Sequence, residues 1–183
     1  MKFIVSICLF AIVASCQDRA LAQDSQTKAP AQLNGKSVTI SYNETRKSSP
    51  DEGGEITTRK VPFKLIVYVS GEGNLFNRLL AGRSTKSSDQ TKGEKDLTRF
   101  ADRETVFDKQ KMTVANSFGN GKGSRVIEAS FDENFANCTA TVVTTVKGEY
   151  ARRRLITGGF ERLYSASTSD ITCAIGAGNA LLN

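Results

Sequence analysis

The sequence predicts an all-β fold, a single antiparallel sandwich or small barrel of seven to nine short strands. Apolar and polar residues alternate with a period of two over several segments, which is typical of half-buried strands. Glycine-rich turns separate these segments, and no apolar stripe with helical spacing extends beyond two turns. The alternative is an α+β fold with a helix over residues 98–107.

The N-terminal half of the expected domain begins with a strand and a hairpin. The folded region is expected to start near Asn34-Gly35, before an apolar alternation at Val38, Ile40 and Tyr42. Lys47 to Gly54 contains Pro50 and two glycines and predicts a loop. Residues 62–80 predict a β-hairpin, because two apolar runs flank the tight connection Gly71-Glu72-Gly73.

The remaining elements are predicted from the same two features, period-two alternation and turn-forming residues. Residues 82–96 are rich in Ser, Thr, Lys and Asp without an apolar residue and predict a mobile loop. Asp132 to Asn137 is expected to form a single helical turn. The strands that we expect in this part cover residues 104–107, 112–118, 124–131, 138–147, 155–157, 160–167 and 171–175.

Residues 1–22 predict an export signal. The apolar run Phe3 to Ala14 is shorter than the about 20 residues that span a bilayer, and it follows a basic residue. Two processing routes stay open: cleavage after Ala20-Leu21-Ala22, or lipidation of Cys16 at the lipobox-like Val13-Ala14-Ser15-Cys16. We therefore expect a periplasmic or secreted protein, or alternatively a membrane-anchored lipoprotein. Residues 23–33 then form a flexible tether, and 34–183 a single β-rich domain.

Cys138 and Cys173 are the cysteines that both processing routes leave in the mature domain. An even number of cysteines in an exported chain predicts a disulfide. The alternative is a pair of buried free thiols. Two cysteines without histidine do not make up a zinc ligand set.

Arg152-Arg153-Arg154 is the most concentrated charge in a chain of net charge +6. One interpretation is a solvated turn or an edge strand on which charge prevents sheet-to-sheet aggregation. The functional interpretation is a contact for an anionic envelope component or for the acidic face of another protein. The charge is too dispersed for a nucleic-acid binder, so we expect no such partner and membrane contact only through a lipid on Cys16.

The chain contains no histidine, which excludes Ser-His-Asp and Cys-His catalysis. The carboxylate pairs Asp51-Glu52 and Asp132-Glu133 do not converge, because adjacent strand residues point to opposite faces. We therefore predict no catalytic residues, no cofactor and no metal site.

The stretches Gly35 to Arg46, Val67 to Arg78 and Cys138 to the glycine-rich end resemble a group of uncharacterised short exported proteins of soil alphaproteobacteria. The resemblance implies bacterial export and a β-rich domain, and it implies no activity. The leading functional hypothesis is an exported, non-enzymatic binding or envelope-associated protein. The alternatives are a secreted protein-interaction or inhibitor module and an enzyme of unrecognised type.

Overall fold

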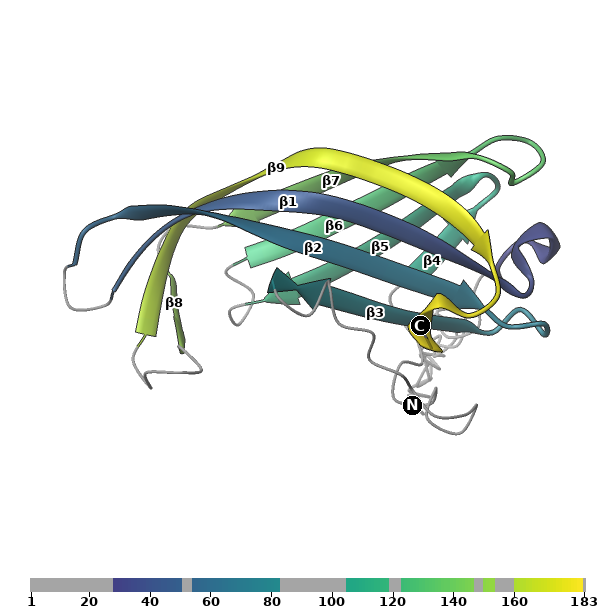
Figure 1. The fold of residues 1–183 in the computed structure, drawn as a ribbon, viewed down its shortest axis with the longest axis horizontal. Helices are drawn as coiled ribbons and strands as arrows, with labels where there is room; N and C mark the ends of the chain where they lie inside the picture. Colours follow the sequence, from purple (N-terminus) through teal and green to yellow (C-terminus); the bar gives the residue numbers. More distant parts are fainter. Residues whose placement is uncertain are drawn as a thin grey trace, which may run out of the picture.

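Nine strands in two antiparallel sheets make up the fold in the computed structural model, which describes residues 28–50, 54–82, 105–118, 123–146, 150–153 and 160–182. Sheet A has the order β3-β2-β1-β9-β8 and contains β1 (Lys36–Pro50), β2 (Thr57–Val69), β3 (Leu75–Ala81), β8 (Tyr150–Arg153) and β9 (Phe160–Ala177). Sheet B has the order β4-β5-β6-β7 and contains β4 (Thr105–Asp108), β5 (Lys111–Phe118), β6 (Gly123–Phe131) and β7 (Cys138–Val146). Sheet A lies in front of sheet B in Figure 1, and the two sets of strands cross.

The predicted all-β class is confirmed, in its sandwich form. Because the described ladders form two separate sheets, the architecture is a sandwich and not a closed barrel. The α+β alternative is wrong where it can be compared, since residues 105–108 form β4 and pair with β5. Within the described ranges, no helix has the length and apolar character needed to cross a membrane.

The core lies between the sheets and consists of alternate residues of both. On β6, for example, Ile127, Ala129 and Phe131 are buried while Val126 and Ser130 face outward. This period-two burial is the physical reason for the alternation in the sequence. The buried apolar side chains of this core come from both sheets: Val38, Ile40, Tyr42, Phe63, Leu65, Val67, Val69, Phe107, Met112, Val114, Ile127, Ala129, Phe131 and Val142.

Strands β1 and β2 are longer than the sequence predicts. Strand β1 continues through Lys47 to Pro50, so the loop expected at 47–54 is wrong for that part. Lys47 and Ser48 pair with both β2 and β9, whereas Ser49 and Pro50 pair with β9 alone. This pairing provides partners for the backbone groups and outweighs the turn preference of Pro50. The hairpin expected at 62–80 is confirmed, with β2 extended back to Thr57.

A bulge replaces the break expected between residues 167 and 171. Strand β9 is continuous from Phe160 to Ala177, and its register against β1 shifts between Ser41 and Asn43. Asp170 takes a φ of 55° there, and its carboxylate accepts hydrogen bonds from Asn43 and Lys60. An extra residue in one strand of a pair is the usual definition of such a bulge.

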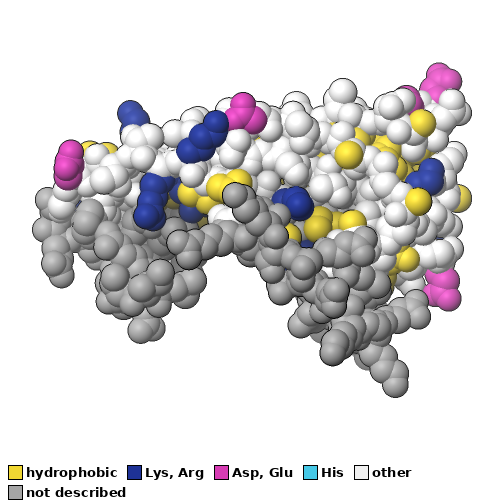
Figure 2. All heavy atoms as spheres, in the orientation of Figure 1, with side chains coloured by type: hydrophobic (Ala, Val, Ile, Leu, Met, Phe, Trp, Pro, Cys, Tyr) yellow, Lys and Arg dark blue, Asp and Glu magenta, His cyan; other side chains and the backbone are white. Residues whose placement is uncertain are grey.

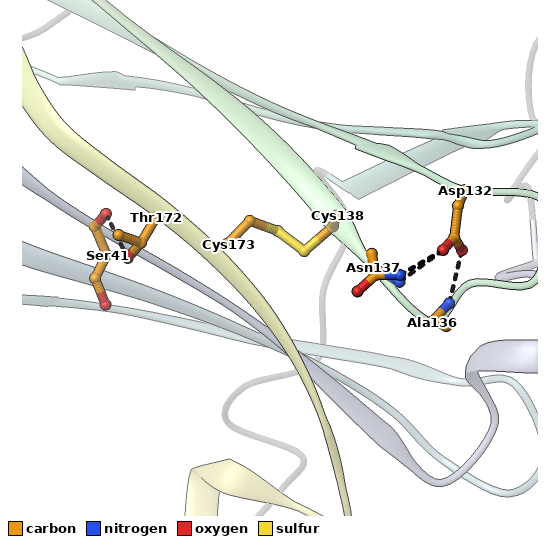
Figure 3. Close-up of a disulfide and its surroundings, with 7 residues drawn as sticks. All are labelled: Ser41, Asp132, Ala136, Asn137, Cys138, Thr172 and Cys173. Carbon is orange, nitrogen blue, oxygen red and sulfur yellow. Dashed lines mark hydrogen bonds between the residues drawn. A yellow bond between two sulfur atoms is a disulfide. The ribbon is translucent and has the colours of Figure 1, made fainter.

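The helical turn expected at Asp132 to Asn137 is an irregular turn instead. Phe135 has a φ of 52° and is buried in the core beside Phe131. The Asp132 carboxylate accepts hydrogen bonds from the backbone N–H groups of Ala136 and Asn137 and from the Asn137 side chain. The turn therefore delivers Cys138 to the start of β7 in a fixed position (Figure 3).

Both ends of the described domain pack against it. The 3₁₀ helix η1 (Ala31–Leu33) places Leu33 in the core, and Ala29 is buried as well. The tether expected up to residue 33 is therefore wrong at its C-terminal end, because burial of Leu33 adds apolar area to the core. At the other end, η4 (Ala180–Leu182) covers the outer side of sheet A through Leu181, which contacts Ile66 and Leu80.

Several expectations fall on residues that the structure does not describe. These are the export signal at 1–22 with Cys16, most of the loop at 82–96, the strand at 155–157 and Arg154.

The predicted disulfide between Cys138 and Cys173 is confirmed, with a Cα–Cα distance of 5.6 Å. It joins β7 of sheet B to β9 of sheet A, two strands that share no described ladder (Figure 3). Thr168 adds a hydrogen bond from its hydroxyl to the carbonyl of Val142 at 2.6 Å. The disulfide and this hydrogen bond therefore connect the two sheets along one side of the sandwich.

Replacing Cys138 and Cys173 together by alanine is expected to lower the free energy of unfolding by roughly 3 to 4 kcal/mol. The estimate follows from the loop of 35 residues that the bond closes in the unfolded chain. Denaturant titration of the variant and of wild type, with and without reductant, measures the difference. Reduction of wild type should reproduce the loss, and an unchanged midpoint in both cases would contradict the structural role.

Candidate functional site

A group of polar side chains lies buried between the sheets, at the end of an otherwise apolar core. It comprises Tyr42, Glu44 and Arg46 on β1, Arg125 on β6 and Thr144 on β7. We call these five residues the Glu44 cluster. Alternate residues of one strand share a face, so Tyr42, Glu44 and Arg46 all point toward sheet B. Glu44 is 0% exposed and Arg125 is 5% exposed.

The carboxylate of Glu44 accepts hydrogen bonds from both sheets. Arg46, on the same strand, donates from Nε to Oε1. Across the sandwich, Arg125 donates from Nη2 to Oε2 at 2.7 Å. The hydroxyl of Thr144 donates to the same Oε2 atom at 3.0 Å. One carboxylate is thus shared by two guanidinium groups.

Aromatic rings hold the guanidinium of Arg125 in place. Its Cζ atom lies 4.7 Å from the ring centroid of Phe63 on β2 and 5.1 Å from that of Phe118 on β5. Phe118 reaches this position because its ring lies across Gly123, the residue opposite it on β6, where a Cβ atom would fall 2.3 Å from the ring. Arg125 is therefore held by cation–π contacts from both sheets.

The pKa values in the cluster reflect burial and these charges. Burial would raise the pKa of Glu44, but the charges and hydrogen bonds of Arg125 and Arg46 outweigh it and hold the pKa below its ordinary value. Burial raises the pKa of Tyr42 to about 12, with the neighbouring arginines acting against it and Glu44 adding to it. At neutral pH, Glu44 is thus ionised and Tyr42 is neutral.

Two polar atoms of the cluster have no hydrogen-bond partner among the residues that the structure describes. They are the hydroxyl of Tyr42 and Nε of Arg125, and both are buried. Both residues pack against one ring: Tyr42 stacks on Phe63 with centroids 5.2 Å apart, and Arg125 lies over the same ring. Buried polar groups are nearly always paired, because an unpaired one loses its hydration without compensation.

The cluster lies at the point along sheet A where its inner face ceases to be buried against sheet B. On β2, alternate side chains from Phe63 to Val69 are buried, whereas Thr57 to Lys60 are exposed on both faces. The arginine at position 59 lies directly opposite Arg46 in the β1–β2 ladder, so the two share a face. Like charges opposite each other destabilise a sheet. Along β1, the side chains that face sheet B thus change from apolar to basic, and the two arginines lie opposite each other at a cost in stability.

The arginines singled out in the sequence lie elsewhere. The backbone of Arg152 and Arg153 belongs to β8, the edge strand of sheet A, whereas Arg154 lies outside the described residues. Their side chains are not described, so their roles as edge guard or as binding residues both stay predictions. The position on an edge strand is the one where charge opposes aggregation.

Some of the other charged groups of the described surface have structural partners. Asp132 is exposed and bonded to its own turn, which lowers its pKa through the hydrogen bonds of Asn137 and Ala136. A shallow hollow on the outer face of sheet B is lined by Lys111 and Glu128, which form an ion pair of 2.8 Å. Among the described residues, no group of three or more acidic, cysteine or histidine side chains is arranged to hold a metal ion.

Sequence reasoning missed the Glu44 cluster, although a signal was present. Glu44 and Arg46 continue the alternation of Val38, Ile40 and Tyr42, and Arg125 falls in step with Ile127. Their parity alone places these charges on the inner face. The partners are 81 residues apart in the chain, so their pairing is visible only in the fold.

Comparison with protein-family models, with curated proteins and with solved structures finds no match for the chain. Its chemistry must therefore be argued from the cluster itself. Glu44 is ionised and accepts three hydrogen bonds, which suits it to hold arginines in place and not to exchange protons. The unpartnered atoms of Tyr42 and Arg125 are the groups that remain free to bind.

Changing Glu44 to glutamine is expected to lower the free energy of unfolding by about 3 to 5 kcal/mol, because it leaves the buried guanidinium groups of Arg125 and Arg46 without a counter-charge. The double variant Arg125→Met with Glu44→Gln should lose clearly less, since it also removes the more deeply buried of the two guanidinium groups. Denaturant titration of both variants gives the comparison. A double variant that is less stable than Glu44→Gln would contradict this electrostatic account of the cluster.

Proposed function

We propose that the chain is an exported, non-enzymatic binding protein whose ligand site is the Glu44 cluster. The observation that carries the proposal is the pair of buried, unpartnered polar atoms on Tyr42 and Arg125. A ligand that supplies the missing hydrogen bonds explains why a core would keep such groups.

The energetics of the cluster support a functional origin. Buried ion pairs are often less stabilising than apolar side chains of the same volume, so stability alone gives little reason to retain one. Departures from good local packing rules concentrate at functional sites. Here the departure combines a buried carboxylate, two arginines that share it and a further arginine opposite Arg46.

Export is proposed from two features of the chain. The disulfide between Cys138 and Cys173 is typical of oxidising compartments outside the cytosol. The apolar segment at 1–22 supports cleavage before Gln23 or lipidation of Cys16. If Cys16 is lipidated, Arg152 to Arg154 would supply a second, electrostatic contact for an anionic envelope component.

The described residues offer less support for an enzyme or for a protein-interaction or inhibitor module. An enzyme needs a group poised to exchange protons, and the buried carboxylate of Glu44 has a pKa below its ordinary value. Large exposed apolar patches often mark protein-interaction sites, whereas the hydrophobic side chains visible on the face in Figure 2 are interspersed with white and charged groups.

Thermal unfolding of protein recovered from the periplasm tests the proposal, after its intact mass has shown a start at Gln23 or a lipidated Cys16. A panel of sugars, amino acids, organic acids, organic phosphates and lipids is added, one compound at a time. At least one is expected to stabilise wild type, by about 2.7 kcal/mol at 100 times its Kd.

The matched control is the double variant Arg125→Met with Glu44→Gln, which removes charge from the cluster at similar volume. It should lose that stabilisation while still unfolding cooperatively. A panel in which every compound shifts wild type and the double variant equally would contradict a ligand site in the Glu44 cluster.

A further inference from the structure

The geometry points to an oxyanion, a carboxylate or a phosphate, as the chemical group that the Glu44 cluster holds. The inference rests on the proposed function and deepens it, because it names the class of ligand. Three independent features carry it: the kind of atom left unpartnered, the balance of charge, and the path by which the site meets the surface.

The unpartnered atoms are hydrogen-bond donors. Nε of a guanidinium carries a hydrogen and has no acceptor capacity. The hydroxyl of Tyr42 can donate or accept, and it carries a proton at neutral pH. Arg125 and Tyr42 both pack on the Phe63 ring, so the two unpartnered donors belong to side chains that share one neighbour. An oxygen with several lone pairs matches both of them.

The charges that the described side chains bring to this region are unequal. Glu44 is the acidic group of the cluster, and Arg46 and Arg125 both bind it. The side chain of Arg46 is 12% exposed and that of Arg125 is 6% exposed, so the excess positive charge is poorly hydrated. An anion adjacent to them would compensate the charge, and such charge-assisted hydrogen bonds are stronger than neutral ones.

The arginines form a path of decreasing exposure toward the unpartnered donors. Arg59 is exposed, Arg46 lies opposite it and is mostly buried, and Arg125, which shares the Glu44 carboxylate with Arg46, is 5% exposed. Successive arginines of decreasing exposure attract an anion from solvent and hold it more strongly as water is excluded. The repulsion between Arg46 and Arg59 would be relieved by the same anion.

Titration with three probes that share a phenyl ring tests the inference: benzoate, phenyl phosphate and the neutral benzamide. Calorimetry of the full chain should show binding of benzoate or phenyl phosphate, and at least tenfold weaker binding of benzamide. The two anions distinguish a carboxylate site from a phosphate site. Tyr42→Phe, which removes one of the two unpartnered donors, should weaken binding of the anion about tenfold.

Arg59→Gln separates a specific site from general attraction by a basic protein. It should weaken anion binding several-fold and reduce its dependence on salt. The matched control is Lys47→Gln, which removes the same charge from the outer face of the neighbouring strand and should leave binding unchanged. Equal effects of the two variants would overturn the inference, because binding would then depend on net charge alone.

The remaining outcomes distinguish the two proposals. Benzamide that binds as tightly as benzoate, and that loses binding in Tyr42→Phe, would overturn the oxyanion class and leave the ligand site in place. The oxyanion class would also be overturned, with the ligand site left in place, if none of the three probes binds while a neutral compound of the larger panel stabilises wild type but not the double variant. Absence of any cluster-dependent binding would overturn both.

Discussion

The carboxylate of Glu44 is the point on which the polar end of the sandwich depends. It accepts from Arg46 within sheet A and from Arg125 and Thr144 of sheet B, so it joins the sheets where apolar packing ends. Without that carboxylate, two guanidinium groups would be left buried without a counter-charge, which is a costly arrangement in a medium of low polarity.

The two kinds of link between the sheets have different effects: one stabilises the fold, and the other positions Arg125. The disulfide from Cys138 to Cys173 and the hydrogen bond from Thr168 to Val142 tie β7 to β9, and the disulfide also restricts the unfolded chain. The Glu44 cluster adds little net stability, but it holds Arg125 between Phe63 and Phe118 with one donor unused. The covalent link provides a stable frame in which a poorly satisfied polar group can be tolerated.

The strand pattern and the disulfide follow from local features of the sequence, and the site does not. Period-two alternation predicts β2, β6 and β7 because each has one buried face. The run of β1 into Pro50 and the bulge at Asp170 escape prediction, since both depend on pairing between distant strands. Glu44 and Arg125 are ordinary surface residue types, and only their parity places them inside.

The stability of Tyr42→Phe in ligand-free protein, measured by denaturant titration in a buffer without carboxylate or phosphate, tests the central claim most directly. Because the hydroxyl of Tyr42 has no partner, the variant should be as stable as wild type or more so. Tyr164→Phe is the matched control, since that hydroxyl bonds Ser49 at 2.8 Å and its loss should lower stability by about 1 kcal/mol. A loss of about 1 to 3 kcal/mol in Tyr42→Phe itself would show that the hydroxyl is already satisfied in the free protein, and would contradict the account.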